Sequence, residues 1–164
     1  MIILKIYEIY DAAGERNERK KWFHVMPNTD VLLYVVNLQG YAKNLSETLR
    51  HNRLKEEYHI CKKSINMKQI RNTKFVVLLN KFNLFIEDIN VYNLSKEFYD
   101  FRGDNRSSKQ VLEYIVEMFL SAIPDNRSNE NIPFIAINAM STDCIKNMFD
   151  FVRNDVIYSN YLNS

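Results

Sequence analysis

The sequence contains few of the residues that build common specialised sites, with three glycines, three prolines and two cysteines among 164 residues. Gly14, Gly40 and Gly103 are too far apart for a G-x-x-x-x-G-K-[ST] phosphate loop or a G-x-G-x-x-G fingerprint. Cys61 and Cys144 cannot alone supply a four-ligand zinc site or a secreted disulfide framework. These residues therefore contain no glycine cradle for a phosphate.

Long hydrophobic runs and a strong charge of one sign are also missing. No apolar run approaches ~18 residues, so no transmembrane helix is predicted. The first residues lack the basic region of a signal peptide, and Lys5 and Glu8 interrupt their apolar stretch. The net charge of +2 is too small to indicate a nucleic-acid or membrane partner. An apolar fraction of 46% and a charged fraction of 26% are typical of one soluble globular domain.

Short apolar runs alternate with helical segments along the chain. Four runs rich in β-branched and aromatic residues predict strands at residues 2–10, 31–36, 75–79 and 134–137. Good helix formers or an amphipathic spacing predict helices at residues 15–26, 47–67, 108–123 and 142–161. The middle two strands are continuous rather than alternating, which favours burial on both faces. The order predicts an α/β domain with a mostly parallel sheet and flanking helices.

Polar residues follow three of the predicted strands. They are Asp11 after the first strand, Asn80, Lys81 and Asn83 after the third, and Asn138 after the fourth. Ligands of parallel α/β sheets bind at the carboxyl ends of the strands, so these residues fit a nucleotide site. Polar residues also end strands in proteins that bind nothing there, and the pattern alone does not separate the two interpretations.

Four strings of the chain, YDAAGERNERKKWFHVM, VVLLNKFNLFIEDI, INAMSTD and NMFDFVRNDVIYSNYL, resemble in collinear order the carboxyl-terminal half of heterotrimeric G-protein alpha subunits. YDAAGERNERKKWFHVM resembles the switch II string D-V-G-G-Q-R-S-E-R-R-K-W-I-H-C-F, and VVLLNKFNLFIEDI resembles the guanine-specificity string I-L-F-L-N-K-K-D-L-F-x-x-K-I. INAMSTD resembles T-C-A-T-D-T, and NMFDFVRNDVIYSNYL resembles the last helix of the family. The resemblance implies that residues 1–164 are a partial Ras-like G domain of the P-loop NTPase type. The phosphate-loop strand and the helical domain of the family lie outside the matched part.

The resemblance implies roles in GTP or GDP binding and in GTP hydrolysis for the switch II residues. Asp11 matches the aspartate that helps to hold Mg²⁺, although an aspartate there also suits a helix N-cap. Gly14 matches the glycine whose N–H meets the γ-phosphate, and Ala13 replaces a second family glycine. Glu15 occupies the position of the catalytic glutamine, where its carboxylate can only accept hydrogen bonds. We therefore expect impaired hydrolysis, although Glu15 would also suit the first turn of a helix.

The resemblance also places four residues around the nucleotide base. Asn80 and Lys81 match the family's Asn-Lys pair, in which the asparagine joins two loops and the lysine stem packs along the base. Asn83 replaces the aspartate that reads guanine, and it matches one of the two guanine donors at most. It is equally consistent with a surface asparagine in an asparagine-rich chain. Ala139 matches the alanine whose backbone N–H contacts the base oxygen.

The most specific string implies protein partners. Arg16, Arg19, Lys21, Trp22 and His24 match the helix that binds the βγ dimer or an effector in the family. Trp22 would be an interface anchor in that interpretation and a core residue in the alternative one. A receptor is a further implied partner, although the chain stops about four residues before the family's end. The resemblance implies a cytoplasmic location, or attachment to the plasma membrane through partners. The rival function is a binding module for βγ or an effector that needs no nucleotide.

Overall fold

The computed structural model describes residues 7–12, 22–45, 48–128 and 130–157. Within these ranges, the central sheet has three parallel strands in the order β1–β4–β5. They span Val31–Asn37, Lys74–Asn80 and Phe134–Ala136. β1 and β4 pair along all 7 residues of each strand. The predicted α/β class with a parallel sheet is confirmed.

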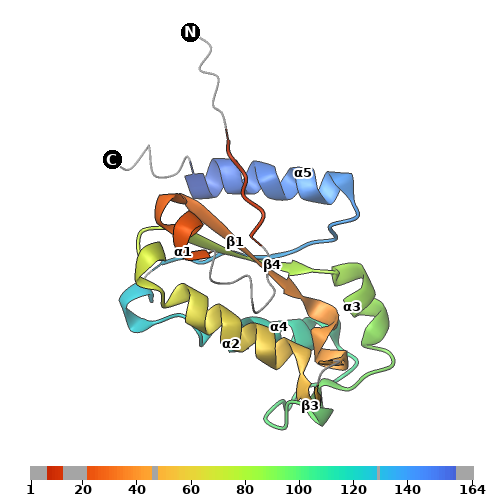
Figure 1. Cartoon of the computed structure of the whole chain (residues 1–164). Helices are drawn as coiled ribbons and strands as arrows, with labels where there is room; N and C mark the ends of the chain where they lie inside the picture. The colour runs from red at the N-terminus through yellow and green to blue at the C-terminus, as the bar shows by residue number, and fades with distance from the viewer. Residues whose placement is uncertain (1–6, 13–21, 46–47, 129, 158–164) are drawn as a thin grey trace.

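Helices cover both faces of this sheet (Figure 1). One face carries α2 (Arg53–Ile65) and α4 (Ser108–Leu120). The other face carries α5 (Thr142–Phe151), which a π-helix over Val152–Ile157 continues. The short helix α3 (Phe82–Asp88) follows β4 directly. Short 3₁₀ helices span Met26–Asn28, Leu38–Ala42, Lys68–Ile70, Leu94–Lys96 and Asp125–Arg127.

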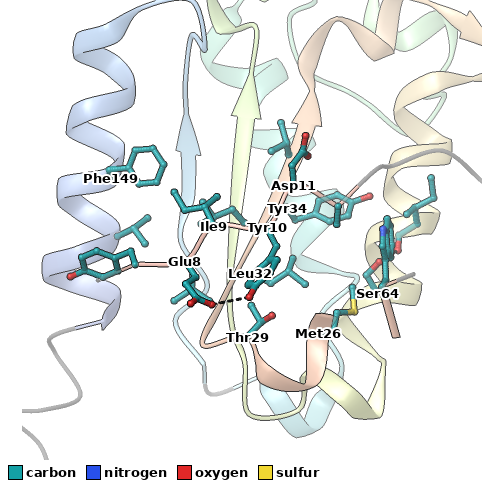
Figure 2. A pocket seen from close by; sticks show the side chains of 18 of the residues that line it. Glu8, Ile9, Tyr10, Asp11, Met26, Thr29, Leu32, Tyr34, Ser64 and Phe149 are labelled. Atoms are coloured by element: carbon teal, nitrogen blue, oxygen red, sulfur yellow. Dashed lines mark hydrogen bonds between the residues drawn. The ribbon is translucent and has the colours of Figure 1, made fainter. Parts of the chain in front are cut away.

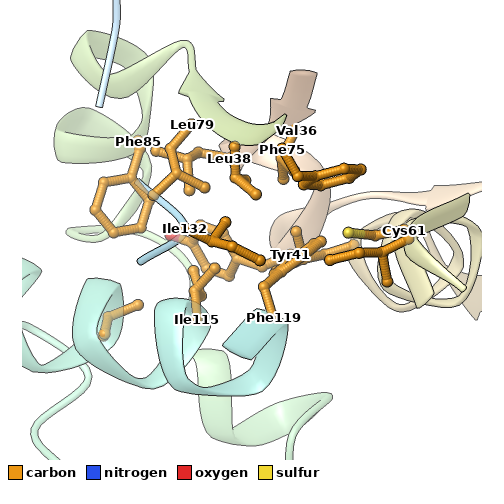
Figure 3. Close-up of a cluster of buried hydrophobic side chains, with 14 of the residues drawn as sticks. Val36, Leu38, Tyr41, Cys61, Phe75, Leu79, Phe85, Ile115, Phe119 and Ile132 are labelled. Carbon is orange, nitrogen blue, oxygen red and sulfur yellow. The ribbon is translucent and has the colours of Figure 1, made fainter. Parts of the chain in front are cut away.

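Two hydrophobic cores lie on opposite faces of the sheet, because successive side chains of a strand point in opposite directions. The larger core, on the α2 and α4 side, contains Phe75, Leu79 and Phe119 (Figure 3). The smaller core, on the α5 side, contains Val76 and Met148. Burial of each such side chain contributes about 1.5–3 kcal/mol of transfer free energy. β4 is buried on both faces, as its continuous apolar sequence predicts.

The helix predicted over residues 47–67 begins later than expected. Residues Thr48–Asn52 form strand β3, which pairs antiparallel with the two-residue strand β2 (Asn44–Leu45). The Asn52 side chain then caps α2, because its Oδ1 accepts the N–H groups of Leu54 at 3.0 Å and Lys55 at 3.3 Å. This cap fixes the start of the helix at Arg53. The prediction was therefore wrong for residues 48–52.

The amino-terminal predictions agree with the structure only in part. Residues 7–10 form no strand, and the rest of that predicted strand lies outside the described residues. Of the helix predicted over residues 15–26, the structure describes α1 (Trp22–Val25) and the 3₁₀ turn that contains Pro27. A segment forms a strand only beside a partner, and within the described ranges β1 pairs with β4 alone. The helix α3 was not predicted.

Candidate functional site

The loops after β4 and β5 are joined by one side chain. The Oδ1 of Asn80 accepts the N–H of Lys81 at 2.7 Å and the N–H of Ala139 at 3.1 Å. The backbone N–H of Phe82 also donates to the Ile137 carbonyl at 3.1 Å. The two segments that the sequence predicts around a nucleotide base therefore lie side by side at the carboxyl ends of two parallel strands. Because Asn80 accepts the Ala139 N–H, that donor is already engaged within the protein.

The second loop is a short turn that leads into α5. Asn138 accepts the N–H of Met140 at 3.0 Å through its side chain, and Ser141 caps α5 by accepting the N–H of Cys144. The thiol of Cys144 in turn accepts the N–H of Asn138. These local bonds fix the turn, while Ala139 and Met140 are exposed, with 92% of the Met140 surface accessible. The loop thus presents a small, ordered surface to solvent.

Lys81 has an uncommon backbone conformation. Its φ of 63° and ψ of 35° are left-handed, and it is the one non-glycine residue with positive φ in the described part of the chain. Such a conformation is costly for an L-residue with a side chain and recurs at functional sites. The bond from its N–H to Asn80 supports this turn. Asn83 lies exposed in the first turn of α3, beyond Lys81.

Glu57 is a site residue that the sequence analysis missed. Its Oε2 accepts the N–H of Asn37, the last residue of β1, at 2.8 Å. Burial raises the pKa of Glu57 to about 7, while the Asn37 N–H, Arg53 and Lys81 oppose that rise. A signal was present, because Glu57 lies three residues after Leu54 and four before Cys61, on the apolar stripe of the helix. A carboxylate on such a stripe indicates a specific buried contact.

Asp11 lies in a groove beside β1. The groove has a volume of about 1150 Å³, and the segment containing Asp11 forms part of its wall (Figure 2). Val35 and Glu57 also line the groove, and the Asp11 side chain is exposed. No group of three or more His, Cys, Asp or Glu side chains that could hold a metal occurs among the residues described. A cation at Asp11 would therefore need ligands from elsewhere.

The switch II residues are described only at the two ends of their string. Ala13, Gly14, Glu15, Arg16, Arg19 and Lys21 lie outside the described residues. Trp22 is 8% exposed and belongs to the larger core together with Met26. His24 is exposed on α1. The burial of Trp22 agrees with its interpretation as a core residue, and a role in partner binding stays a prediction.

No helix in the described ranges is long and apolar enough to span a membrane.

The sequence profile of the G-protein alpha subunit family matches residues 4–157. The chain is 30% identical over 162 residues to the human guanine nucleotide-binding protein subunit alpha-12. The aligned part covers 97% of this chain and 42% of that protein. It is 30% identical to the alpha-6 subunit of Caenorhabditis elegans, over 84% of this chain and 36% of that protein. The alpha-1 subunit of Saccharomyces cerevisiae is 30% identical over 94% of this chain. The chain thus spans less than half the length of these relatives. The profile match covers nearly all of it, and the chain belongs to the G-protein alpha subunit family.

Proposed function

We propose that this chain forms the base-binding side of a guanine nucleotide site in a signal transducer of the alpha-subunit type. The observation that carries the proposal is the Asn80 side chain, which holds Lys81 and Ala139 together at the carboxyl ends of β4 and β5. This edge is where parallel α/β sheets bind ligands. The relatives named above are guanine nucleotide-binding proteins, which supports the same assignment.

Base recognition would rest on three residues of these loops. The stem of Lys81 would pack along the base, and the Ala139 N–H, shared with Asn80, would meet a base oxygen. Asn83 would face the edge of the base that carries the 2-amino group. An amide offers one acceptor and one donor, so it satisfies one guanine donor and opposes the other. A base with a 2-oxo group, such as xanthine, suits Asn83 better, and we propose a weakened preference for guanine.

The phosphate side of the site fits Mg²⁺ in one respect. Asp11 is an exposed carboxylate, and Mg²⁺ is commonly held by one or two carboxylates together with phosphate oxygens and water. Asp11 would hold the ion, and the backbone at Ala13 and Gly14 would lie near the phosphates. When bound, GTP would supply the γ-phosphoryl group that is transferred to water. Glu15 would add a negative charge there and could not donate to the water, so we propose that hydrolysis is impaired.

A second function is a binding module for a βγ dimer or an effector that acts without nucleotide. The string from Arg16 to His24 is the most family-specific part of the sequence, and His24 is exposed at its end. Arg16, Arg19 and Lys21 would supply the charges of that surface. A receptor is a third partner class of the proposed transducer. If βγ binds equally with and without GDP, the binding module is the better description.

Titration of the 164-residue chain with a fluorescent guanine nucleotide tests the proposed function. The 164 residues contain no G-x-x-x-x-G-K-[ST] loop, which supplies much of the phosphate affinity in nucleotide-binding proteins. We expect saturable binding no tighter than high micromolar, displaced by GDP more readily than by ATP. Submicromolar affinity would contradict the weak-binding account. Equal displacement by GDP and ATP, or no binding at millimolar nucleotide, would contradict the nucleotide site itself.

A further inference from the structure

Tyr41 is a large, fully buried side chain whose hydroxyl has no protein partner. The residue is 2% exposed and lies in the larger core (Figure 3). In the described part of the chain, its Oη is the one buried side-chain oxygen or nitrogen without a hydrogen-bond partner. Buried polar groups of folded proteins are almost always hydrogen-bonded to protein or to ordered water, because an unpaired group costs free energy. The hydroxyl therefore calls for a partner that these residues do not supply.

Charged groups near the hydroxyl are already engaged elsewhere. Burial, the main cause, raises the pKa of Tyr41 to about 12, Asp88 adds to the rise and Arg106 opposes it. One oxygen of Asp88 accepts the side-chain amide of Gln39 at 2.8 Å. The Arg106 guanidinium donates to the Ile89 carbonyl at 2.6 Å. The Tyr41 hydroxyl keeps its proton at neutral pH, so it can both donate and accept a hydrogen bond.

A small cavity of mixed polarity adjoins Tyr41. Its volume is about 110 Å³. Its walls come from the 3₁₀ turn Leu38–Ala42 and from residues 92–97, and the lining residues are Tyr41, Ala42, Tyr92, Asn93, Lys96 and Glu97. Asn93 occupies the N-cap position of the 3₁₀ turn Leu94–Lys96, but its side chain makes no cap hydrogen bond. Hydroxyl, amide, ammonium and carboxylate side chains therefore line the same small space.

The size and the lining of the cavity favour water over a larger ligand. Small-molecule sites commonly occupy roughly 300–1,000 Å³ and are mostly apolar. One water takes about 30 Å³ in the liquid, so a cavity of about 110 Å³ holds about three waters. A buried water typically makes about three hydrogen bonds to polar groups that lack other partners. The Tyr41 hydroxyl is such a group.

We propose that the cavity is a hydration site, in which ordered water binds the Tyr41 hydroxyl and links it to the Asn93 side chain. Tyr41 already makes two other long-range contacts. Its carbonyl accepts the side-chain amide of Asn52, the cap of α2, at 2.7 Å, and its ring packs edge-on against Phe85 of α3, with centroids 5.9 Å apart. The bound water adds a third link, to residues 92–97. Tyr41 thereby joins the start of α2, the helix α3 and the segment that follows α3.

Removal of the hydroxyl has opposite effects in a hydrated and in a dry cavity. Tyr41→Phe keeps the ring and deletes only the oxygen. A hydroxyl bound to water loses a hydrogen bond, which lowers the urea midpoint of unfolding, whereas removal of an unpaired hydroxyl raises that midpoint. We expect the 164-residue chain to show a lower midpoint. Tyr99→Phe is the matched control, because Tyr99 is 78% exposed and its midpoint should equal that of the wild type.

Nuclear Overhauser effects between water and methyl protons test for the bound water in the wild-type chain. Methyl protons do not exchange with solvent, so a cross-peak reports nearby water or a nearby exchanging hydroxyl. We expect a water cross-peak at the methyl group of Ala42, which lines the cavity, with the sign of long-lived water. The methyl group of Ala122, which is 2% exposed and lies outside the lining, should show none. Tyr41→Phe should weaken the Ala42 cross-peak, because the water loses one of its partners.

Three results would overturn the proposal. An unchanged or higher urea midpoint for Tyr41→Phe would show that the hydroxyl binds nothing in the folded protein. Absence of the water cross-peak at Ala42 would show that the cavity is dry. A lower midpoint without that cross-peak would show that a rotated side chain, such as Glu97, is the partner of the hydroxyl.

Discussion

Asn80 binds the backbone of Ala139, a residue 59 positions later in the chain, through a hydrogen bond of 3.1 Å. The same oxygen accepts the N–H of Lys81 at 2.7 Å. One amide therefore fixes both the turn that follows β4 and its distance from the loop that follows β5. The proposed base site depends on this relationship.

Asn80→Ala should loosen both loops. The change leaves two backbone N–H groups without their acceptor, and we expect a loss of about 1–2 kcal/mol in the free energy of unfolding. Urea denaturation measures this loss. Asn83→Ala is the matched control, because Asn83 is exposed and its change should stay within about 0.5 kcal/mol. If the two variants are equally stable, the Asn80 bridge does not hold the loops.

Lys81→Gly should raise stability and weaken nucleotide binding together. The left-handed conformation at φ 63° costs an L-residue roughly 1–2 kcal/mol, and glycine removes this cost. Part of the gain in stability is lost because glycine gives up more backbone entropy on folding. We expect a gain of up to about 1 kcal/mol in urea denaturation and a weaker fluorescence response to guanine nucleotide. Lys81→Ala should weaken binding without the gain in stability. A glycine variant that binds as tightly as wild type would show that the lysine stem does not contact the base.

Glu57 should make stability fall between pH 4.5 and pH 7. Its pKa is raised from 4.5 to about 7, so the folded state holds a proton that the unfolded state releases. This contribution is complete below pH 4.5 and is lost as the pH rises through 7. Relative to Glu57→Gln, the wild type should lose at most about 3 kcal/mol over that range. Denaturation at pH 4.5 and pH 8 measures the difference.

Glu113→Gln is the control for loss of one negative charge, because the Glu113 side chain is 57% exposed. If the free energies of unfolding of Glu57→Gln and of the wild type change with pH in the same way, the Glu57 carboxyl is not protonated in the folded protein. The glutamine retains an oxygen that can accept the Asn37 N–H, so the comparison isolates charge rather than hydrogen bonding.

Arg127 should be far more important for stability than exposed cations. It is 3% exposed, pairs with Glu130 at 2.6 Å and donates to the carbonyls of Ile70 and Thr73. Arg127→Ala removes these bonds and should cost about 3 kcal/mol. Lys109→Ala, whose side chain is 84% exposed, should cost less than about 1 kcal/mol. Thermal unfolding of both variants compares them, and equal losses would contradict the structural role of Arg127.

The sequence predicted the sheet where apolar runs were short and bounded by turns. The runs at residues 31–36, 75–79 and 134–137 became β1, β4 and β5. The helix start at Arg53 was missed because the Asn52 cap, rather than propensity, decides it. The strand predicted at residues 7–10 is not formed. A strand needs a neighbouring strand to pair with, and the sequence does not show whether one is present.

The candidate site was predictable to the extent that local strings define it. Asn80, Lys81 and Ala139 were expected together and lie together. Glu57 was missed because its role depends on a hydrogen bond with Asn37, 20 residues away in the sequence. Only the packing of α2 on β1 brings these two residues together. The buried position of Trp22 likewise depends on tertiary packing, which the string around it does not specify.

Titration of the isotope-labelled chain with GDP, followed by backbone NMR, tests the central claim most directly. The account predicts that the amide signals of Lys81, Phe82, Ala139 and Met140 shift together and saturate at one concentration, with smaller shifts for ATP. Unchanged signals at these four residues in millimolar GDP, or shifts confined to other parts of the chain, would contradict it.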